Sequence, residues 1–560
     1  MSESTRLNPL DAAWLFTETR ATPNHVGGLL QFRLPAEAPR AYMRDLMASF
    51  REHRSFAPPW NRRLKLPFLK NPVPMWVEDE DEDIDLEYHV RHAALPWPGG
   101  ERELGELVGR LQSTPIDLAR PPWECTLIEG LEGERFALFI KMHHSLIDGV
   151  SGVKLLQRAM ASDPARSLAL PPFWAIGIER GDKPPKPAKA NRSKPSPTVA
   201  QALSAAAEGL SEQAKSVPQL VTAFAKILRR IGDPSDGMVV PFDSPRSVLN
   251  GRVREKRRFA TQQFPLQRLR AVASAAQCTL NDVVLALCGG ALRRFLMDRD
   301  SLPDKSLTAG IPVSVRPKDD EGAGNAISFI VATLGTDIED AASRLQTIRA
   351  SVLHAKAHVQ SLPKQAMLQY TMLLMAPTIL TLLTGIGGRT RPMFNITISN
   401  VPGPEKPLYF RGAELVATYP ASIVSHGQAL NITCQSYAGS MNFGFTGCHS
   451  SLPSLQRLAV FTADALLELE AAVLPASVPA PATVPVPAPT RSAAAAPVKK
   501  VGARKPVAKA EPVGKTPEEA ATVAKRRARP RAVPGAVSVA VSGAAPLSSP
   551  PKPPRKRVAA

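Results

Sequence analysis

Apolar and polar positions along the first part of the chain follow two different periods. Runs that are continuously apolar, or that alternate with polar residues, predict β-strands, as in "GGLLQFRL" (27–34) and "RFALFIKM" (135–142). Apolar positions spaced three and four apart predict amphipathic helices, as in "LGELVGRLQS" (104–113) and "GVSGVKLLQRAM" (149–160). This mixture predicts a domain that contains both kinds of element.

The same two periods return after residue 251. The stretch "LNDVVLALCGGALRRFLMD" has apolar positions at helical spacing, with Thr279 before it as a plausible N-cap. Five later runs are β-branched or alternating and predict strands: "LTAGIPVSV", "MFNITISN", "ELVATYP", "ALNITCQSY" and "MNFGFTG". We therefore predict two α/β domains in tandem with mixed sheets, and we find no Rossmann or Walker fingerprint.

Composition suggests where these domains begin and end. The stretch 162–197 is rich in Pro and Lys, and helical periodicity follows it over 198–232. We accordingly divide the chain into an N-terminal domain (1–160), a linker and crossover helix (161–251), a C-terminal domain (252–474) and a tail (475–560). The tail is a Pro/Ala/Lys-rich mixture with almost no aromatic residues, so we predict that it is disordered.

The net charge of +19 is concentrated in that tail. From Arg491 onward there are sixteen Lys or Arg residues against three Glu, a net charge of +13, which leaves +6 for the first 490 residues. A basic disordered arm can bind anionic lipid surfaces or nucleic acid, and it can equally serve only to keep the protein soluble. The charge therefore says little about the chemistry of the folded part, and any nucleic-acid binding would involve the tail alone.

Cysteine usage and the N-terminus favour a cytoplasmic protein. The five cysteines are scattered and form no CxxC pair, which indicates reduced thiols and neither a disulfide framework nor a zinc knuckle. The opening "MSESTRLNPLDAAWLF" lacks the apolar core of a signal peptide. One uncharged run, Met367–Gly388, approaches the length of a membrane span, but Pro377 and several polar residues interrupt it. A helix that rests on a lipid surface or covers an apolar tunnel, and a buried core helix, are the two favoured interpretations.

Candidate chemistry is concentrated where the strand 136–142 ends. His143, His144, Asp148 and Gly149 lie on the turn into the next helix. A metal site is one alternative, although adjacent histidines point away from each other and the spacing lacks the glutamate of HExxH. A structural histidine pair is another. The third is a general base, because imidazole titrates near neutral pH and one ring nitrogen can be held while the other accepts a proton. Asp148 could lock the turn or contact His144, and Gly149 would give the backbone freedom there.

These residues and several later blocks resemble one family. "HHSLIDG" is similar to the HHxxxDG signature of the acyl-CoA-dependent acyltransferase superfamily, which includes chloramphenicol acetyltransferase and condensation domains. The surrounding sequence resembles the bacterial wax ester synthase/diacylglycerol acyltransferase branch over about residues 7 to 472. Its blocks occur here in the same order, with Pro122 where leucine is usual: "LNPLDAAWLFTETRATPNHVGGLLQF", "RPPWECTLIEGL", "LNDVVLALCGGALRRFL", "GIPVSVRP", "GAGNAIS" and "SNVPGP".

The resemblance implies two chloramphenicol-acetyltransferase-like domains with a catalytic channel between them. It implies an O-acyltransferase that moves a long-chain acyl group from acyl-CoA to diacylglycerol, to a long-chain fatty alcohol, or to both. His144 would be the general base, with His143 in a supporting role and no acyl-enzyme intermediate. We expect acyl-CoA as co-substrate, no bound cofactor or metal, and peripheral association with the inner membrane or lipid inclusions. The alternatives are a condensation-type enzyme with another hydroxyl or amine acceptor, and a non-catalytic lipid-surface or nucleoid-associated protein.

Other residues in the matching blocks have both structural and functional interpretations. Asn281 and Asp282 begin a helix, so capping is the simplest role, and positioning of the catalytic loop or substrate is the alternative. Ser399 and Asn400 follow a strand, where they form either a plain turn or part of an oxyanion site. Gly324 and Asn325 are most simply a turn, and Trp123 is expected to pack against the histidine loop. Four further histidines are taken as structural or surface residues: His25, His89, His92 and His426.

Overall fold

The computed structural model describes a large part of the chain outside the tail. It covers residues 4–7, 9–65, 74–147, 149–176, 239, 242–314, 327–360 and 387–474. These residues belong to a single compact unit, Met1–Ala482. Several predictions lie outside the described residues: the helix over 198–232, residues 367–386 of the apolar run, Gly324 and Asn325, Asp148, and the tail after 474.

The first of two six-stranded sheets contains the strand that leads to the paired histidines. Its strands are antiparallel except for β5 and β6, which run parallel. In spatial order they are β12 (Tyr409–Phe410), β13 (Ala413–Ala421), β2 (His25–Arg33), β7 (Arg135–His143), β6 (Trp123–Leu131) and β5 (Val90–Ala94). β7 therefore lies inside the sheet, paired on both sides.

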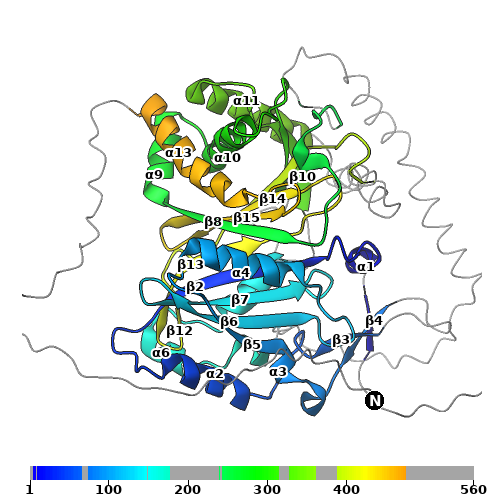
Figure 1. Ribbon diagram of the computed structural model, residues 1–560, viewed down its shortest axis with the longest axis vertical. Helices are drawn as coiled ribbons and strands as arrows, with labels where there is room; N and C mark the ends of the chain where they lie inside the picture. The colour runs from blue at the N-terminus through cyan, green and yellow to red at the C-terminus, as the bar shows by residue number, and fades with distance from the viewer. Residues whose placement is uncertain are drawn as a thin grey trace, which may run out of the picture. The chain divides into compact units, whose positions relative to one another are not determined.

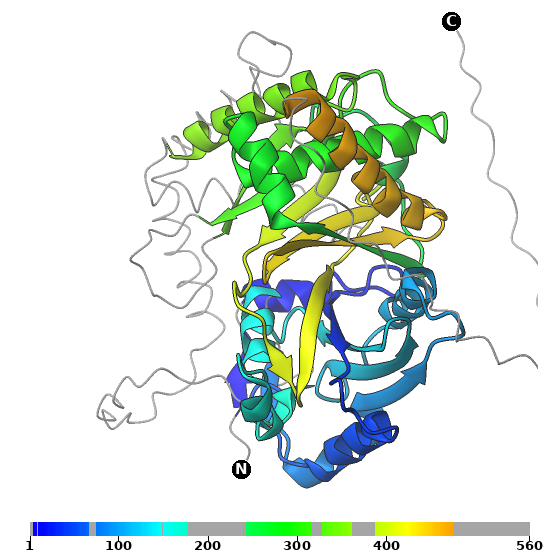
Figure 2. The same cartoon turned by 90° about the vertical axis from the view of Figure 1, so that its left-hand side faces the viewer.

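Two strands of this sheet come from the C-terminal half of the sequence. β13 pairs antiparallel with β2 over Glu414–Ala421, and β12 forms the sheet edge beyond it. Figure 2 shows β13 in yellow running beside the blue N-terminal strand. The sheet is thus completed by a segment that lies almost four hundred residues further along the chain.

The second six-stranded sheet is built from the C-terminal half. β11 runs parallel to both of its neighbours, β9 and β14, and the other pairings are antiparallel, so the sheet is mixed as predicted. In spatial order the strands are β10 (Ile327–Thr333), β9 (Thr308–Ser314), β11 (Ile396–Val401), β14 (Leu430–Tyr437), β15 (Ser440–Cys448) and β8 (Arg257–Pro265).

Helices cover one face of the second sheet and both faces of the first. Figure 1 shows four helices over the second sheet: α9 (Leu266–Ala275), α10 (Leu280–Met297), α11 (Ala341–Gln360) and α13 (Leu455–Val473). Their apolar residues form one core with strands β8, β9, β11, β14 and β15. On the first sheet, Phe50 of α2 (Tyr42–Glu52) packs with Phe32 on one face, and Val108 of α4 (Glu101–Ser113) packs with Phe139 on the other.

α4 is the helix that lies between the two sheets (Figure 1). Two glycines one turn apart allow the close approach to β8. A Cβ on Gly105 would lie 2.6 Å from the carbonyl oxygen of Phe259, and one on Gly109 would lie 3.0 Å from that of Arg257. Gly105 and Gly109 are therefore contact positions, because a side chain there would force the helix away from the strand.

Smaller elements surround these layers. A three-stranded antiparallel sheet contains β1 (Ser4–Arg6), β4 (Met75–Glu78) and β3 (Arg62–Lys65). Four short helices complete the described fold: α1 (Pro9–Phe16), α3 (Leu86–His89), α5 (Gly149–Gln157) and α6 (Pro164–Leu168). The start of the predicted linker is packed, because Phe173 and Trp174 are buried in the same core as α2.

The periodic patterns gave the correct element types. Every predicted strand and helix named above that lies within the described residues is present, with shifts of a few residues at the ends. Thr279 is the N-cap of α10, as predicted, and its side chain accepts a hydrogen bond from the backbone N–H of Asp282. Within the described part, no single helix is long and apolar enough to cross a membrane, although the bent pair α9 and α10 meets that test by length and composition.

Candidate active site

The paired histidines end β7 and begin the turn into α5. The backbone N–H of His143 donates to the carbonyl of Pro122 at 2.9 Å, and that of His144 donates to the carbonyl of Asn24 at 2.9 Å. Pro122 directly precedes β6 and Asn24 directly precedes β2, the two strands that flank β7. The turn is therefore anchored on both sides, which fixes the directions in which the two imidazoles leave the backbone.

His143 uses both ring nitrogens inside the protein. It is fully buried, with Nδ1 2.6 Å from Ser145 Oγ and Nε2 3.0 Å from Glu18 Oε2. The backbone N–H of Ser145 also donates to Nδ1, at 3.2 Å. Because Nδ1 accepts that bond, the proton of the neutral ring lies on Nε2, from which it is donated to Glu18. His143 therefore supports the loop and has no ring nitrogen left for substrate.

His144 has a different environment from its neighbour. It is half-buried, and its imidazole stacks on the indole of Trp14 with ring centroids 4.3 Å apart and an interplanar angle of 29°. Asn24, whose carbonyl accepts the His144 N–H, also donates through Nδ2 to the Trp14 carbonyl at 2.7 Å and to Thr17 Oγ1 at 3.0 Å. One short segment, 14–24, thus holds both the backbone and the ring face of His144.

The motif glycine begins the helix that follows the histidine turn. Gly149 is the first residue of α5, and a Cβ placed there would meet nothing within 4 Å. It is also absent from the glycines with positive φ in the described ranges. That Gly149 gives the backbone freedom at the turn into α5 stays a prediction. Asp148, its neighbour, lies outside the described residues.

Asp282 closes the start of α10. Its Oδ2 accepts from the backbone N–H of Thr279 at 2.9 Å and from Thr279 Oγ1 at 2.7 Å, which completes a capping box. The residue is buried, and Oδ1 has no hydrogen-bond partner among the described residues. Asn281 precedes it and is half-buried. Capping is therefore shown for Asp282, while a role of Asn281 in positioning substrate stays a prediction.

Ser399 and Asn400 do not form a turn. Both lie in β11, which continues to Val401, and they pair in parallel register with Thr433 and Cys434 of β14. The plain-turn interpretation is wrong because the ladder with β14 keeps the backbone extended through both residues, which are also the last two of the predicted strand "MFNITISN". Their contribution to an oxyanion site stays a prediction.

Trp123 packs in the core beside β7, and its packing against the histidine loop itself stays a prediction. It is fully buried on β6, opposite Met142 of β7, and its indole N–H donates to the carbonyl of Trp60 at 2.8 Å. Its ring stacks on the imidazole of His89, with centroids 4.5 Å apart. His89 Nδ1 lies 2.7 Å from the Trp123 carbonyl, and burial lowers the pKa of His89 from 6.5 to about 4.

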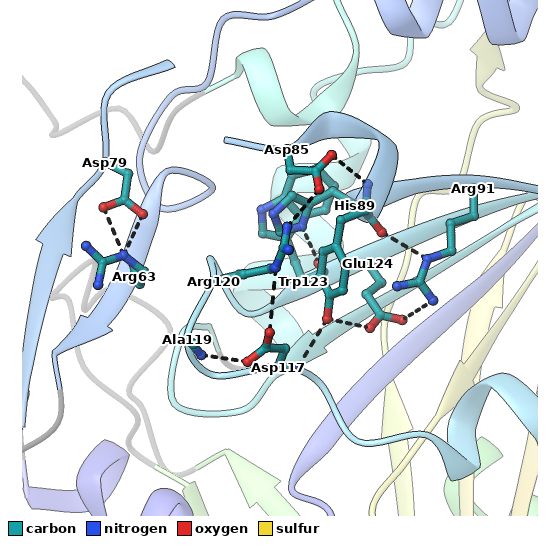
Figure 3. Close-up of polar contacts among 11 residues, drawn as sticks. Arg63, Asp79, Asp85, His89, Arg91, Asp117, Ala119, Arg120, Trp123 and Glu124 are labelled. Carbon is teal, nitrogen blue, oxygen red and sulfur yellow. Dashed lines mark hydrogen bonds and ion pairs between the residues drawn. The ribbon is translucent and has the colours of Figure 1, made fainter. Parts of the chain in front are cut away.

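Charged residues around Trp123 and the following Glu124 join α3 to β6 (Figure 3). Arg91 lies 3.5 Å from Glu124, and the hydroxyl of Tyr88 lies 3.4 Å from the same carboxylate. Arg120 covers the Tyr88 ring, with its guanidinium carbon 4.3 Å from the centroid, and pairs with Asp85 at 2.9 Å. The hydrogen bond from Arg120 lowers the pKa of the exposed Asp85 carboxyl. This network stabilises the segment that carries Pro122, whose carbonyl accepts the backbone N–H of His143.

A buried lysine connects that network to α4. Lys141, two residues before His143, places Nζ 3.1 Å from Glu124 Oε2 and donates to the carbonyls of Leu111 and Thr114 at 3.1 and 2.8 Å. Those carbonyls are at the C-terminal end of α4, where a cation is favourable. Desolvation lowers the pKa of Lys141, and the carboxylate of Glu124 opposes that shift. The buried ammonium of Lys141 therefore links β7, the strand that ends at the histidines, to the C-terminal end of α4.

The remaining histidines and the cysteines have structural contacts or form no metal site among the described residues. His25, also buried, places Nε2 2.9 Å from the Gln112 carbonyl, His92 lies 3.4 Å from Glu129, and His426 accepts the N–H of Val253. Across the described ranges, no group of three or more His, Cys, Asp or Glu is placed to hold a metal ion. The five cysteines are free thiols.

Sequence reasoning missed the partners that hold the histidines. Trp14, Glu18 and Asn24 lie in the N-terminal block "LNPLDAAWLFTETRATPNHVGGLLQF", to which no role was assigned. Glu18 and His143 are 125 residues apart in sequence. No local pattern predicts such a contact; the only available signal was that polar residues precede the strand that pairs with β7.

Comparisons with known proteins identify the fold and the family. The family model for the wax ester synthase/diacylglycerol acyltransferase catalytic domain matches residues 7–284, and the model for the C-terminal domain matches 323–470. The chain belongs to this family. A Mycobacterium tuberculosis protein named for diacylglycerol O-acyltransferase activity is 44% identical, over 83% of this chain and 97% of its own. The O-acyltransferase WSD of Acinetobacter baylyi is 40% identical, over 81% of this chain and 94% of its own.

Solved structures agree. The wax ester synthase/diacylglycerol acyltransferase of Marinobacter aquaeolei matches with a TM-score of 0.66 and 37% identity, covering 83% of this chain and 99% of that one. The first condensation domain of the calcium-dependent antibiotic synthetase matches with a TM-score of 0.51 and 18% identity, over 85% and 98% of the two chains. That second likeness concerns the fold alone, and the two structures together confirm the predicted α/β fold class with mixed sheets.

Proposed function

We propose that His144 is the general base of an acyl transfer from acyl-CoA to a hydroxyl group. As a member of its family, the chain is an O-acyltransferase that forms triacylglycerol from diacylglycerol, wax ester from a long-chain fatty alcohol, or both. One observation carries the assignment to His144. Both ring nitrogens of His143 are engaged inside the protein, so of the two adjacent histidines it is the half-buried His144 that we assign to the substrate.

The residues fit a single displacement at the thioester carbon. His144 takes the proton of the acceptor hydroxyl as its oxygen attacks, which gives a tetrahedral oxyanion. Collapse of that intermediate breaks the carbon–sulfur bond, and the imidazolium returns the proton to the departing CoA thiolate. The products are an ester and free CoA, and no group on the protein is acylated. Ser399 and Asn400 are the proposed oxyanion donors, and acyl-CoA enters as a co-substrate with no resident cofactor.

We further propose that this chemistry takes place at a lipid surface in the cytoplasm. Diacylglycerol and long-chain alcohols partition into membranes and lipid inclusions, so the enzyme meets its acceptor at that boundary. The basic tail supports the proposal, because clustered lysine and arginine are attracted to anionic lipid. Peripheral association with the inner membrane or with lipid inclusions follows from this.

The first experiment identifies the product. Purified protein is incubated with palmitoyl-CoA and, separately, with hexadecanol, dioleoylglycerol or a long-chain amine, and the lipids formed are identified by mass spectrometry. Hexadecyl palmitate or triacylglycerol is the expected product. Amide formation with no ester would instead indicate a condensation-type enzyme and overturn the proposed acceptor class.

The second experiment tests the base. His144→Ala should lower turnover by roughly 10²–10⁴-fold with the fold intact, since this is the usual share of general-base catalysis. His143→Ala should act mainly through stability, because it removes the contacts with Ser145 and Glu18. Asp148→Asn should reduce activity and stability together. Circular dichroism checks folding, and wild-type turnover by a folded His144→Ala protein would contradict the mechanism.

A further inference from the structure

The indole of Trp14 is placed to act on the proposed base. It lies against the face of the His144 imidazole at 4.3 Å and 29°, within the range of aromatic stacking. Trp14 is in α1, while His144 follows β7, so the contact joins segments about 130 residues apart in sequence. Both side chains are half-buried, which means that the contact lies at the edge of the protein interior rather than deep in a core.

The position of Trp14 is itself fixed. Its carbonyl accepts from Asn24 Nδ2 at 2.7 Å, and the preceding carbonyl, of Ala13, accepts from Thr17 Oγ1 at 2.9 Å. Asn24 also supplies the carbonyl that anchors the backbone of His144. One residue thus fixes the separation between the last turn of α1 and the histidine loop, and the stacked pair cannot slide apart without breaking these bonds.

We propose that Trp14 is a positioning residue that holds the His144 imidazole in its working plane and stabilises its protonated form. This rests on the proposed role of His144 as the base. The face of an indole carries negative potential, and among aromatic rings it attracts cations most strongly. The imidazole becomes a cation when it takes the acceptor's proton. Trp14 therefore favours the transition state more than the ground state, which is the condition for accelerating the chemical step.

Substituting Trp14 alone leaves every other charged or titratable group near the histidine turn in place. Among the described residues these groups include Asp11 on α1, Glu18 after α1, His25 on β2, Glu124 on β6, Lys141 and His143 on β7, and Arg257 on β8, which donates to the Ala21 carbonyl. Asp148, the motif aspartate, lies outside the described residues. Because all of them remain, a change in the titration of His144 in Trp14 variants reports the loss of the ring.

The test uses Trp14→Phe and Trp14→Leu in the full-length enzyme, with hexadecanol and palmitoyl-CoA. Turnover should fall by about 2-fold to 30-fold in the order wild type, Phe, Leu, following the strength of the cation–π contact. The apparent pKa on the acidic limb of the kcat/KM profile should fall in the same order, by about 0.5–1.5 units for Leu. The KM for palmitoyl-CoA should stay unchanged.

A matched control and a double variant separate this role from simple packing. Trp97 is 93% exposed in the loop before α4, so Trp97→Leu should leave turnover and pH profile unchanged. Adding Trp14→Leu to His144→Ala should lower turnover no further, because Trp14 acts through that imidazole. Folded Trp14 variants with the wild-type pH profile, or losses that multiply in the double variant, would overturn the proposal. High activity of His144→Ala alone would instead refute the proposed base.

Discussion

At the residue scale, two identical side chains in sequence become chemically different through their partners. His143 alternates to the interior side of β7 and gives both nitrogens to Ser145 and Glu18. His144 follows where the strand ends and stacks on Trp14. The motif predicted that the two would differ, because neighbouring residues on an extended chain point to opposite sides. It could not predict which contacts make the difference, since Glu18 and Trp14 come from the distant N-terminal segment.

His89 gives a pH-dependence that can be measured. Its pKa is about 4 in the folded protein against 6.5 when solvated, so the unfolded chain binds a proton between these values that the folded chain does not. Stability should therefore fall as pH drops from 6.5 towards 4, by about 3 kcal/mol from this residue. His89→Phe keeps an aromatic ring against Trp123 but cannot titrate.

Denaturant unfolding at pH 7.5 and at pH 4.5 checks this expectation. His89→Phe should be less stable than wild type at the higher pH, by about 1 kcal/mol, because the Trp123 carbonyl loses its donor. The variant should then lose clearly less stability than wild type on acidification. His25, another buried histidine whose pKa is lowered by burial, is present in both proteins and affects them equally. Identical losses in the two proteins would show that His89 does not carry the effect.

At the element scale, the strands and helices were predictable because their apolar patterns are local. β13 reads as a strand from its alternation, and it is buried at every second residue in the structure. The partner of a strand, in contrast, cannot be predicted from the strand's own pattern. Nothing in "ELVATYP" indicates that it pairs with β2, and nothing in "MFNITISN" indicates that its strand runs parallel to both β9 and β14. Pairing depends on the assembled sheet, which a single segment cannot reveal.

Lys141 links β7 to α4 through hydrogen bonds, and replacing it should lower the free energy of unfolding. Lys141→Met deletes the donor to the carbonyls of Leu111 and Thr114 and leaves Glu124 buried with only Arg91 as a cationic partner. Removing one partner of a buried pair costs about 3–5 kcal/mol, so the free energy of unfolding should fall by that amount. Denaturant titration measures it, and turnover should fall as the histidine turn loosens.

Two further variants define the cause. Lys154→Met, on the exposed side of α5, removes a lysine without a buried charge and should change stability by less than about 0.5 kcal/mol. Lys141→Met combined with Glu124→Leu removes both charges and should recover part of the loss, since apolar replacement of a whole buried pair is often neutral. An unchanged free energy of unfolding in the Lys141→Met variant would contradict the proposed role of Lys141 in linking β7 to α4.

At the scale of the whole molecule, the two halves of the sequence are interleaved. β13 leaves the C-terminal half to pair with β2, and its backbone passes so close to β15 that a Cβ on Gly444 would lie 2.0 Å from the carbonyl oxygen of Pro420. α4 approaches β8 through its glycines in the same way. A contiguous segment of sequence therefore does not reveal the sheets. β13 pairs with a strand almost four hundred positions away, and Gly105 of α4 contacts Phe259 of β8, about 150 positions away.

The basic tail gives the last prediction, since the family match ends at residue 470 and the charge lies beyond it. Deleting residues after 476 should leave acyl transfer to a short, soluble alcohol nearly unchanged. It should weaken binding to vesicles that contain anionic phosphatidylglycerol, and the difference from wild type should shrink as salt rises. Replacing the tail lysines and arginines with glutamine at full length isolates charge from length. Loss of folding and of soluble-alcohol activity on truncation would show that the tail belongs to the enzyme's structure.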